Sequence, residues 1–306
     1  MDNRQKEYEN RYGLILGKRR SAGQKKRFTQ QIQADLRQLG WEPAIPESGS
    51  RCGNLYFGNW QSARTIFCAY YDTGRNHLFP YQVNPFDGGS QRRELVILGL
   101  RWIVGLALAA IGLGLVMKLH LSLSMRGILC FLVLWISNKG IRGNDSPLNY
   151  SRNTAAILTM LDIAAEIKEK NSVAFALLDE GHHLHSGVMM MSQEMPLACK
   201  TKKFIFLDCV AQGDVIAATG NILKDEIQKA GIEVISMSDR EKKNTPLAYV
   251  EQALMIAFLS CDKGMLSCPL PPSRKDACLN ERLRSELLTH LLDWCKKEEG
   301  EKFGSE

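Results

Sequence analysis

The apolar run from Leu95 to Met117, LVILGLRWIVGLALAAIGLGLVM, limits the folds open to this chain more than any other segment. It contains 23 residues and a single charge, Arg101, close to its start. About 20 consecutive apolar residues are enough for an α-helix to cross the hydrocarbon core of a bilayer. The run therefore predicts a transmembrane helix, because glycine-rich stretches of this length without acidic residues are uncommon in soluble cores.

A second apolar segment, residues 119–137, follows closely and is interrupted by Arg126. A long arginine side chain reaches the polar interface when it lies near the turn between two spans. Trp102 and Trp135 fall where interfacial aromatic residues are expected. We therefore predict an inserted two-helix transmembrane hairpin over residues 91–141. The alternative is a hairpin buried in the core of a water-soluble protein.

The basic residues around the hairpin favour termini in the cytoplasm. The outer ends carry Arg92, Arg93, Lys139 and Arg142, whereas Lys118 and Arg126 lie near the connecting turn. This excess agrees with the tendency of basic residues to stay on the cytoplasmic side. Nine scattered cysteines without a CxxC pair, and a polar N-terminus unlike a signal peptide, indicate the same reducing compartment. We expect a multi-pass membrane protein with two helices and a cytoplasmic soluble domain.

The net charge of +6 is modest, and its densest basic runs are GKRR and GQKKR near the N-terminus. We expect these runs to form a solvated face, with an anionic bilayer surface as the alternative. The sequence has no Gly-rich phosphate loop, no Gly-x-Ser-x-Gly elbow and no basic-aromatic stripe. Nucleic acid is therefore not expected among the partners.

Outside the hairpin, apolar strands alternate with helices. Helices are predicted over 22–39, 155–170 and 279–297, and strands over 65–71, 173–179, 203–210 and 253–260. This alternation is typical of an α/β fold with a mostly parallel sheet flanked by helices. We expect residues 1–90 and 142–306 to form one domain, into which the hairpin of residues 91–141 is inserted.

The run LLDEGHHLHSG, Leu177–Gly187, is the most chemically suggestive in the chain. Two carboxylates and three imidazoles directly follow an apolar strand there, and these are the side chains that bind zinc. His182 and His185 share one face if the segment turns helically, with Asp208 as a third ligand of a single-metal site. The alternative is a polar loop at the end of a strand, without bound metal.

Six patterns follow one another in an order that resembles one enzyme family. They are GKRRSAGQKKRFTQQIQADLRQLGWE, NLYFGNWQSARTIFCAYYDTG, SRNTAAILTMLDIA, VAFALLDEGHHLHSG, FIFLDCVAQGD and LPPSRKDA. In this order they are similar to the opening helix and metal-binding segments of the di-zinc aminopeptidases (metallopeptidase family twenty-eight), related to bacterial leucyl aminopeptidase and glutamate carboxypeptidase. The resemblance implies a three-layer zinc-exopeptidase fold. Membrane helices inserted at this point resemble a trait of one bacterial branch.

The resemblance assigns family roles to individual residues. In the family, two zinc ions share a bridging aspartate, and each also binds one histidine and one further carboxylate. Tyr70 stands at the first histidine, Arg152 at the bridging aspartate and Pro272 at the last histidine, so these ligand positions are degenerate. Asp72, which orients the first histidine in the family, and the carboxylate Asp208 are retained. We further predict that Arg152 replaces the metal charge by pairing with Asp208 or Asp72.

The same alignment places Gly181 at the general base and His182 at the ligand glutamate. A slip of one or two residues instead places Glu180 or Asp179 there. The resemblance therefore implies a catalytically inactive pseudopeptidase that acts by binding or scaffolding, with an unidentified protein or peptide partner and no cofactor. The alternative is an active, atypical zinc aminopeptidase with a rebuilt site around His182 and Asp208, to which His185 and Asp72 are further possible ligands.

Overall fold

The computed structural model describes residues 3–45, 53–73, 84–142, 149–181, 185–262, 265–268 and 278–300. Its helices are α1 (Asn3–Glu9), α2 (Ala22–Gln38), α3 (Gly88–Lys118), α4 (Leu123–Arg142), α5 (Ala155–Glu166), α6 (Ser186–Glu194), α7 (Pro196–Thr201), α8 (Lys224–Lys229), α9 (Asp239–Lys242) and α10 (Glu281–Gly300). Shorter helical segments are η1 (Asn10–Ile15), η2 (Tyr150–Thr154) and η3 (Pro246–Ala248). The strands are β1 (Leu55–Phe57), β2 (Thr65–Tyr70), β3 (Val173–Leu178), β4 (Lys203–Leu207), β5 (Val215–Gly220), β6 (Glu233–Val234), β7 (Gln252–Asp262) and β8 (Met265–Ser267).

The strands form a mixed sheet in the order β1-β3-β2-β4-β7-β5-β6, with β8 paired to β7. The central strands β3, β2, β4 and β7 are parallel, because long crossover connections join them. β1 pairs antiparallel with β3, and β5 pairs antiparallel with β7. β2 precedes α3 and α4 in the chain, whereas its neighbours β3 and β4 follow them. The sheet is therefore assembled from segments on both sides of the hairpin.

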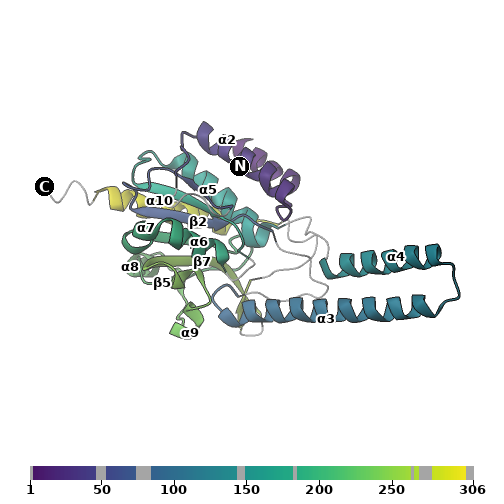
Figure 1. The fold of residues 1–306 in the computed structure, drawn as a ribbon. Coiled ribbons are helices and arrows are strands. Elements are labelled where there is room, and N and C mark those ends of the chain that lie inside the picture. Colours follow the sequence, from purple (N-terminus) through teal and green to yellow (C-terminus); the bar gives the residue numbers. More distant parts are fainter. Residues whose placement is uncertain are drawn as a thin grey trace.

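Alternate residues along the strands face two cores, one on each side of the sheet. Phe67 and Phe175 pack in the core that includes residues of α2, α5 and α10. Ile66 and Ala174 pack in the core that includes residues of α6 and α7. Figure 1 shows these helices flanking the sheet. The predicted α/β fold with helices around a sheet is therefore confirmed, with antiparallel pairs on either side of the parallel centre.

Two of the differences from the sequence prediction concern α5 and β5. α5 ends at Glu166 and not at 170, because the backbone of Ile167 becomes extended and its side chain is buried. The strand β5 is absent from the prediction, because its sequence VIAATG has small side chains and only two strongly apolar residues at its start. Pairing with β7 buries Ala217 and Ala218 completely, which stabilises this strand in the tertiary structure.

Helices α3 and α4 form an antiparallel hairpin that projects away from the sheet (Figure 1). Nε of Arg101 in α3 donates a hydrogen bond of 2.8 Å to the carbonyl oxygen of Gly140 in α4. Nearer the turn, a Cβ atom added to Gly112 would lie 2.8 Å from Cγ1 of Val133. Glycine therefore permits the two helices to approach closely.

The apolar side chains of the hairpin are largely exposed. They include Ile103, Leu106, Leu108, Ile111 and Leu115 of α3 and Ile128, Phe131, Leu134 and Ile136 of α4. In the described part of the chain, one helix is long and apolar enough to cross a membrane, α3 over Gly99–Lys118, and 11% of its most apolar window is buried. This exposure contradicts the alternative of a hairpin buried in a soluble core. A second span in α4 stays a prediction.

Candidate functional site

The candidate site lies at the carboxyl ends of three neighbouring parallel strands, β3, β2 and β4. Asp72 lies two residues beyond β2, Asp179 and Glu180 directly follow β3, and Asp208 directly follows β4. The three aspartates are buried. The carboxyl edge of a parallel sheet is where α/β proteins generally bind ligands. The fold thus brings these predicted residues to one edge of the sheet.

Three non-glycine residues at this edge have a left-handed backbone conformation. They are Glu180 with φ 55°, His185 with φ 56° and Cys209 with φ 56°. Such conformations are uncommon for residues with a Cβ and cluster at functional sites. The thiol of Cys209 lies 3.3 Å from Oδ1 of Asp208, to which it donates a hydrogen bond. Glu180 after β3, Cys209 after β4 and His185 before α6 are therefore held in sparsely populated conformations.

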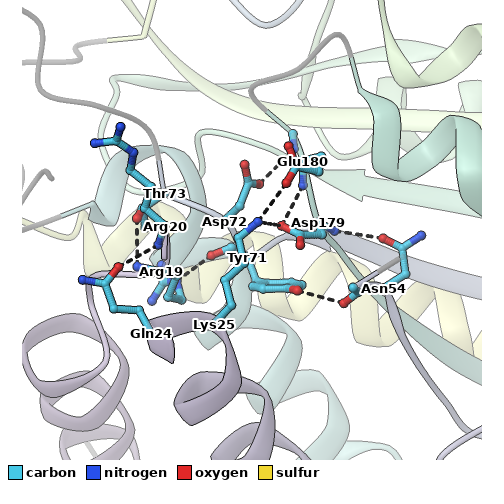
Figure 2. A network of polar contacts seen from close by, with 12 residues as sticks. Arg19, Arg20, Gln24, Lys25, Asn54, Tyr71, Asp72, Thr73, Asp179 and Glu180 are labelled. Carbon is cyan, nitrogen blue, oxygen red and sulfur yellow. Dashed lines mark hydrogen bonds and ion pairs between the residues drawn. The ribbon is translucent and has the colours of Figure 1, made fainter. Parts of the chain in front are cut away.

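Lys25, in the first turn of α2, joins the two carboxylates that follow β3 (Figure 2). Its Nζ lies 2.6 Å from Oδ1 of Asp179 and 2.9 Å from Oε1 of Glu180. Burial lowers the pKa of Lys25, but hydrogen bonds to both carboxylates outweigh burial and hold that pKa above the usual lysine value. The side chain is therefore a protonated ammonium at neutral pH.

A second cation, Arg19, is completely buried beside the end of β2 (Figure 2). Its guanidinium donates hydrogen bonds to the carbonyl oxygens of Tyr71 (2.6 Å), Tyr12 (3.0 Å) and Leu16 (3.0 Å) and to Oγ1 of Thr154 (2.8 Å). Burial lowers the pKa of Arg19 to about 10, although the negative charge of Asp72 raises it. Arg19 therefore ties η1, η2 and the end of β2 together.

Asp72 is bonded to two other segments of this edge. Its Oδ1 accepts a hydrogen bond of 2.9 Å from the backbone N–H of Gly181. Its carbonyl oxygen accepts a hydrogen bond from the side-chain amide of Asn153 in η2. In the family that the sequence resembles, the corresponding aspartate orients a histidine. Here Asp72 instead holds the backbone of Gly181, three residues beyond the end of β3.

Tyr70 and Gly181 occupy two of the positions that the resemblance assigns to a ligand and the general base. The hydroxyl of Tyr70 lies 2.5 Å from Nδ1 of the buried His185, with which it forms a hydrogen bond. A Cβ atom added to Gly181 would lie 2.6 Å from Cγ and Cδ1 of the Tyr70 ring. A larger side chain at Gly181 therefore requires the Tyr70 ring to move.

Several predicted site residues lie outside the described part of the structure. They are His182, Pro272 and the side chain of Arg152. The pairing of Arg152 with Asp208 or Asp72 therefore stays a prediction. The rebuilt metal site on His182 and Asp208 also stays a prediction.

The described residues do not fit the di-zinc centre that the resemblance implies. The ammonium of Lys25 contacts the carboxylates of Asp179 and Glu180, and Tyr70 is bonded to Nδ1 of His185. A divalent cation beside Lys25 would be repelled by the ammonium. In the described ranges, no group of three His, Cys, Asp or Glu side chains is arranged to hold a metal ion.

The prediction that the basic runs form a solvated face is wrong for two residues. Arg19 is completely buried and Lys25 is half-buried, whereas Lys18, Lys26 and Arg27 are exposed. Arg19 is the arginine of a Gly-x-Arg sequence, Gly17-Lys18-Arg19, which begins the opening-helix pattern of the resemblance. Lys25 has no comparable signal, because its partners lie more than 150 residues away in the sequence. Two adjacent acids directly after a buried strand are the one hint that a cation is needed nearby.

Comparison with known proteins gives weak similarities to several solved structures. No protein-family model and no curated protein matches this chain. It is similar to a zinc aminopeptidase from Bacillus subtilis, with a TM-score of 0.40 and 9% identity, over 78% of this chain and 49% of that chain. It is also similar to a protein described provisionally as a peptidase/endoglucanase, with a TM-score of 0.44 and 10% identity, over 94% and 97% of the two chains. The chain spans about half the length of the aminopeptidase. Similarity this low transfers no activity or ligand set to the chain.

Proposed function

We propose that this chain is a membrane-tethered, peptidase-like protein that lacks peptidase activity and acts by binding a protein or peptide. One observation carries the proposal: the ammonium of Lys25 contacts both acidic side chains at the end of β3, at 2.6 and 2.9 Å. An internal cation there satisfies the carboxylates that a hydrolase would use for a metal or a general base. The close packing of Gly181 against the Tyr70 ring supports the same conclusion.

The metal content of protein purified without a histidine tag tests this proposal. We expect substoichiometric zinc by elemental analysis and no release of amino acids from a panel of aminoacyl chromogenic substrates, before or after addition of zinc. Stoichiometric zinc, together with turnover that Asp208→Ala abolishes, would establish the alternative of an atypical zinc aminopeptidase. His182→Ala should then reduce zinc content as well, whereas the exposed control Lys26→Ala should leave zinc content unchanged.

The binding function requires a partner that recognises the carboxyl edge of the sheet. Capture from detergent-solubilised membranes with the full chain, followed by mass spectrometry, identifies candidates. We expect Lys25→Met, which removes the cation at this edge, to reduce recovery of a specific polypeptide. Lys26→Met, a change at an exposed neighbour, should retain recovery. Equal recovery with both variants would place the partner elsewhere on the molecule.

Membrane tethering is proposed for both helices of the hairpin, with the sheet domain in the cytoplasm. The exposed apolar side chains of α3 and α4 support this proposal, because patches of this extent need cover from lipid or protein. Cys261 and Cys278 are exposed in the sheet domain and serve as reporters. A membrane-impermeant maleimide should modify them only after cells are permeabilised, with a Cys261→Ser/Cys278→Ser variant as the control. Modification in intact cells would contradict the cytoplasmic orientation.

A further inference from the structure

The described residues that precede and follow the hairpin in the chain lie at the carboxyl edge of the sheet. β2 ends at Tyr70 on this edge, and the chain then leads to α3. After α4 the chain returns to η2, where Thr154 accepts a hydrogen bond from Arg19 and Asn153 donates to Asp72. In Figure 1 the hairpin extends away from the domain on the side toward which the parallel strands run. The carboxyl edge therefore faces the direction in which the hairpin projects.

The base of the hairpin is close to η2 along the chain. Arg101, near the start of the apolar stretch of α3, donates a hydrogen bond to the carbonyl oxygen of Gly140, two residues before the end of α4. If α3 and α4 span the membrane as proposed, the bilayer surface on the side of the sheet domain lies near the last turn of α4. Tyr150 follows Arg142 by eight residues, and so lies no more than about 29 Å from it even in a fully extended chain.

An exposed apolar pair lies beside η2. Leu14 and Ile15, at the end of η1, are 59% and 77% exposed. Their neighbour Gly13 packs directly against the Tyr150 ring, because a Cβ atom there would overlap the Tyr150 hydroxyl. In the sheet domain, a pair this exposed next to the attachment point of a membrane hairpin is suited to contact with lipid.

The residues that follow this pair carry positive charge. Lys18 is exposed, and Arg20 is partly exposed. Basic residues close to an anionic leaflet are attracted to its headgroups, by roughly a factor of five for each residue. Because the hairpin already tethers the domain, a small apolar contact of this kind is enough to favour one orientation at the surface.

We propose that Leu14 and Ile15 insert at the headgroup–acyl boundary of the bilayer that α3 crosses, with Lys18 against anionic headgroups. The inference rests on the membrane span stated under the proposed function. It assigns the domain a fixed orientation in which the carboxyl edge, with Lys25 and Asp179, faces the membrane surface. A partner would then reach this edge along the bilayer.

Photo-crosslinking of the full chain in nanodiscs tests this contact. A benzophenone amino acid replaces Ile15, Leu108 or Leu197 in discs of phosphatidylcholine and phosphatidylserine. Leu108 lies at the centre of the apolar stretch of α3 and is the positive control. Leu197 is 64% exposed in α7, which leads to the amino end of β4, and is the matched negative control. We expect lipid adducts at positions 15 and 108 and background levels at position 197.

The outcomes separate the two proposals. Adducts at position 108, with position 15 no higher than position 197, would overturn the surface contact and leave the span intact. Background at position 108 would overturn the span, and this inference with it. Lys18→Ala should lower the adduct yield at position 15 about fivefold in anionic discs and leave it unchanged in pure phosphatidylcholine discs. An equal yield for Lys18 and Lys18→Ala in anionic discs would overturn the headgroup contact.

Discussion

Two apolar helices of this chain have opposite surroundings. α5 buries ten consecutive residues, Ala155–Ala164, in the core formed with the sheet, α2 and α10. α3 is rich in the same residue types, yet 11% of its most apolar window is buried. The two helices differ in length, 12 residues against 31, and in what lies next to them. The apolar side chains of a helix must be buried against protein or lipid. The sheet domain buries those of α5, whereas it leaves those of α3 exposed.

The largest expected effect comes from truncating one phenylalanine in each region. Phe175 is fully buried in β3, whereas Phe131 is 67% exposed in α4. Phe175→Ala should lower the free energy of unfolding by about 3–5 kcal/mol, because it leaves a cavity in the core. Phe131→Ala should change it by no more than about 0.5 kcal/mol in detergent. Denaturant unfolding in detergent measures both, and equal losses would show that the hairpin is part of the core.

A charge at the centre of each helix should produce opposite results. Leu108→Asp places a charge in the middle of the apolar stretch of α3. It should make the free energy of membrane integration less favourable by about 3 kcal/mol. Leu158→Asp lies in the buried face of α5 and should unfold the sheet domain without an effect on integration. Carbonate extraction of membranes and protease resistance of the domain report the two outcomes. If Leu108→Asp lowers protease resistance as much as Leu158→Asp, the proposed difference between the helices is wrong.

The polar edge of the sheet domain should respond to the loss of its cation. Lys25→Met leaves the buried carboxylate of Asp179 without its ammonium partner, at a cost of about 2 kcal/mol of unfolding free energy. Lys26→Met, at an exposed position, should have almost no effect. Chemical unfolding at neutral pH measures the difference, and an equal cost for the two variants would show that Lys25 has no special role.

The same contact has a defined pH dependence. The folded-state pKa of Lys25 is raised above that of an ordinary lysine. The contribution of this contact to the free energy of unfolding is therefore fully present below the usual lysine pKa of about 10.4. That contribution is lost as the pH rises through the higher folded-state value. The stability difference between the wild type and Lys25→Met should thus be constant from neutral pH to about pH 9 and shrink above about pH 10.5. A difference that already disappears near pH 8 would contradict the raised pKa.

The smallest effect is expected for the outer carboxylate of the pair. The side chain of Glu180 is 42% exposed, whereas that of Asp179 is 9% exposed. Glu180→Gln should cost about 0.5 kcal/mol of unfolding free energy, and less in 1 M salt, because water and ions screen an exposed contact. Asp179→Asn, measured alongside, should cost more and be less sensitive to salt. The reverse order would show that Glu180 is the principal partner of Lys25.

Much of the fold could be predicted from local patterns. The strands β2, β3, β4 and β7 are continuous apolar runs, and α2, α5 and α10 have helical periodicity, so each was predicted near its observed position. β5 was not, because its small residues become strand only through pairing with β7. In the site, Asp72, Asp179, Glu180 and Asp208 could be placed at strand ends. Their partners could not, since a hydrogen bond between distant segments leaves no local pattern.

The sequence by itself determined that this chain contains a helix long and apolar enough for a bilayer, and that carboxylates follow its buried strands. Both properties depend on the residues in one short window. Only the tertiary structure decided which cation meets those carboxylates and which apolar helix is covered. Lys25 and Lys26 are adjacent lysines in one helix, and the orientation of α2 on the sheet alone directs the first to Asp179. Charge pairing and burial depend on distances that are set by the whole fold.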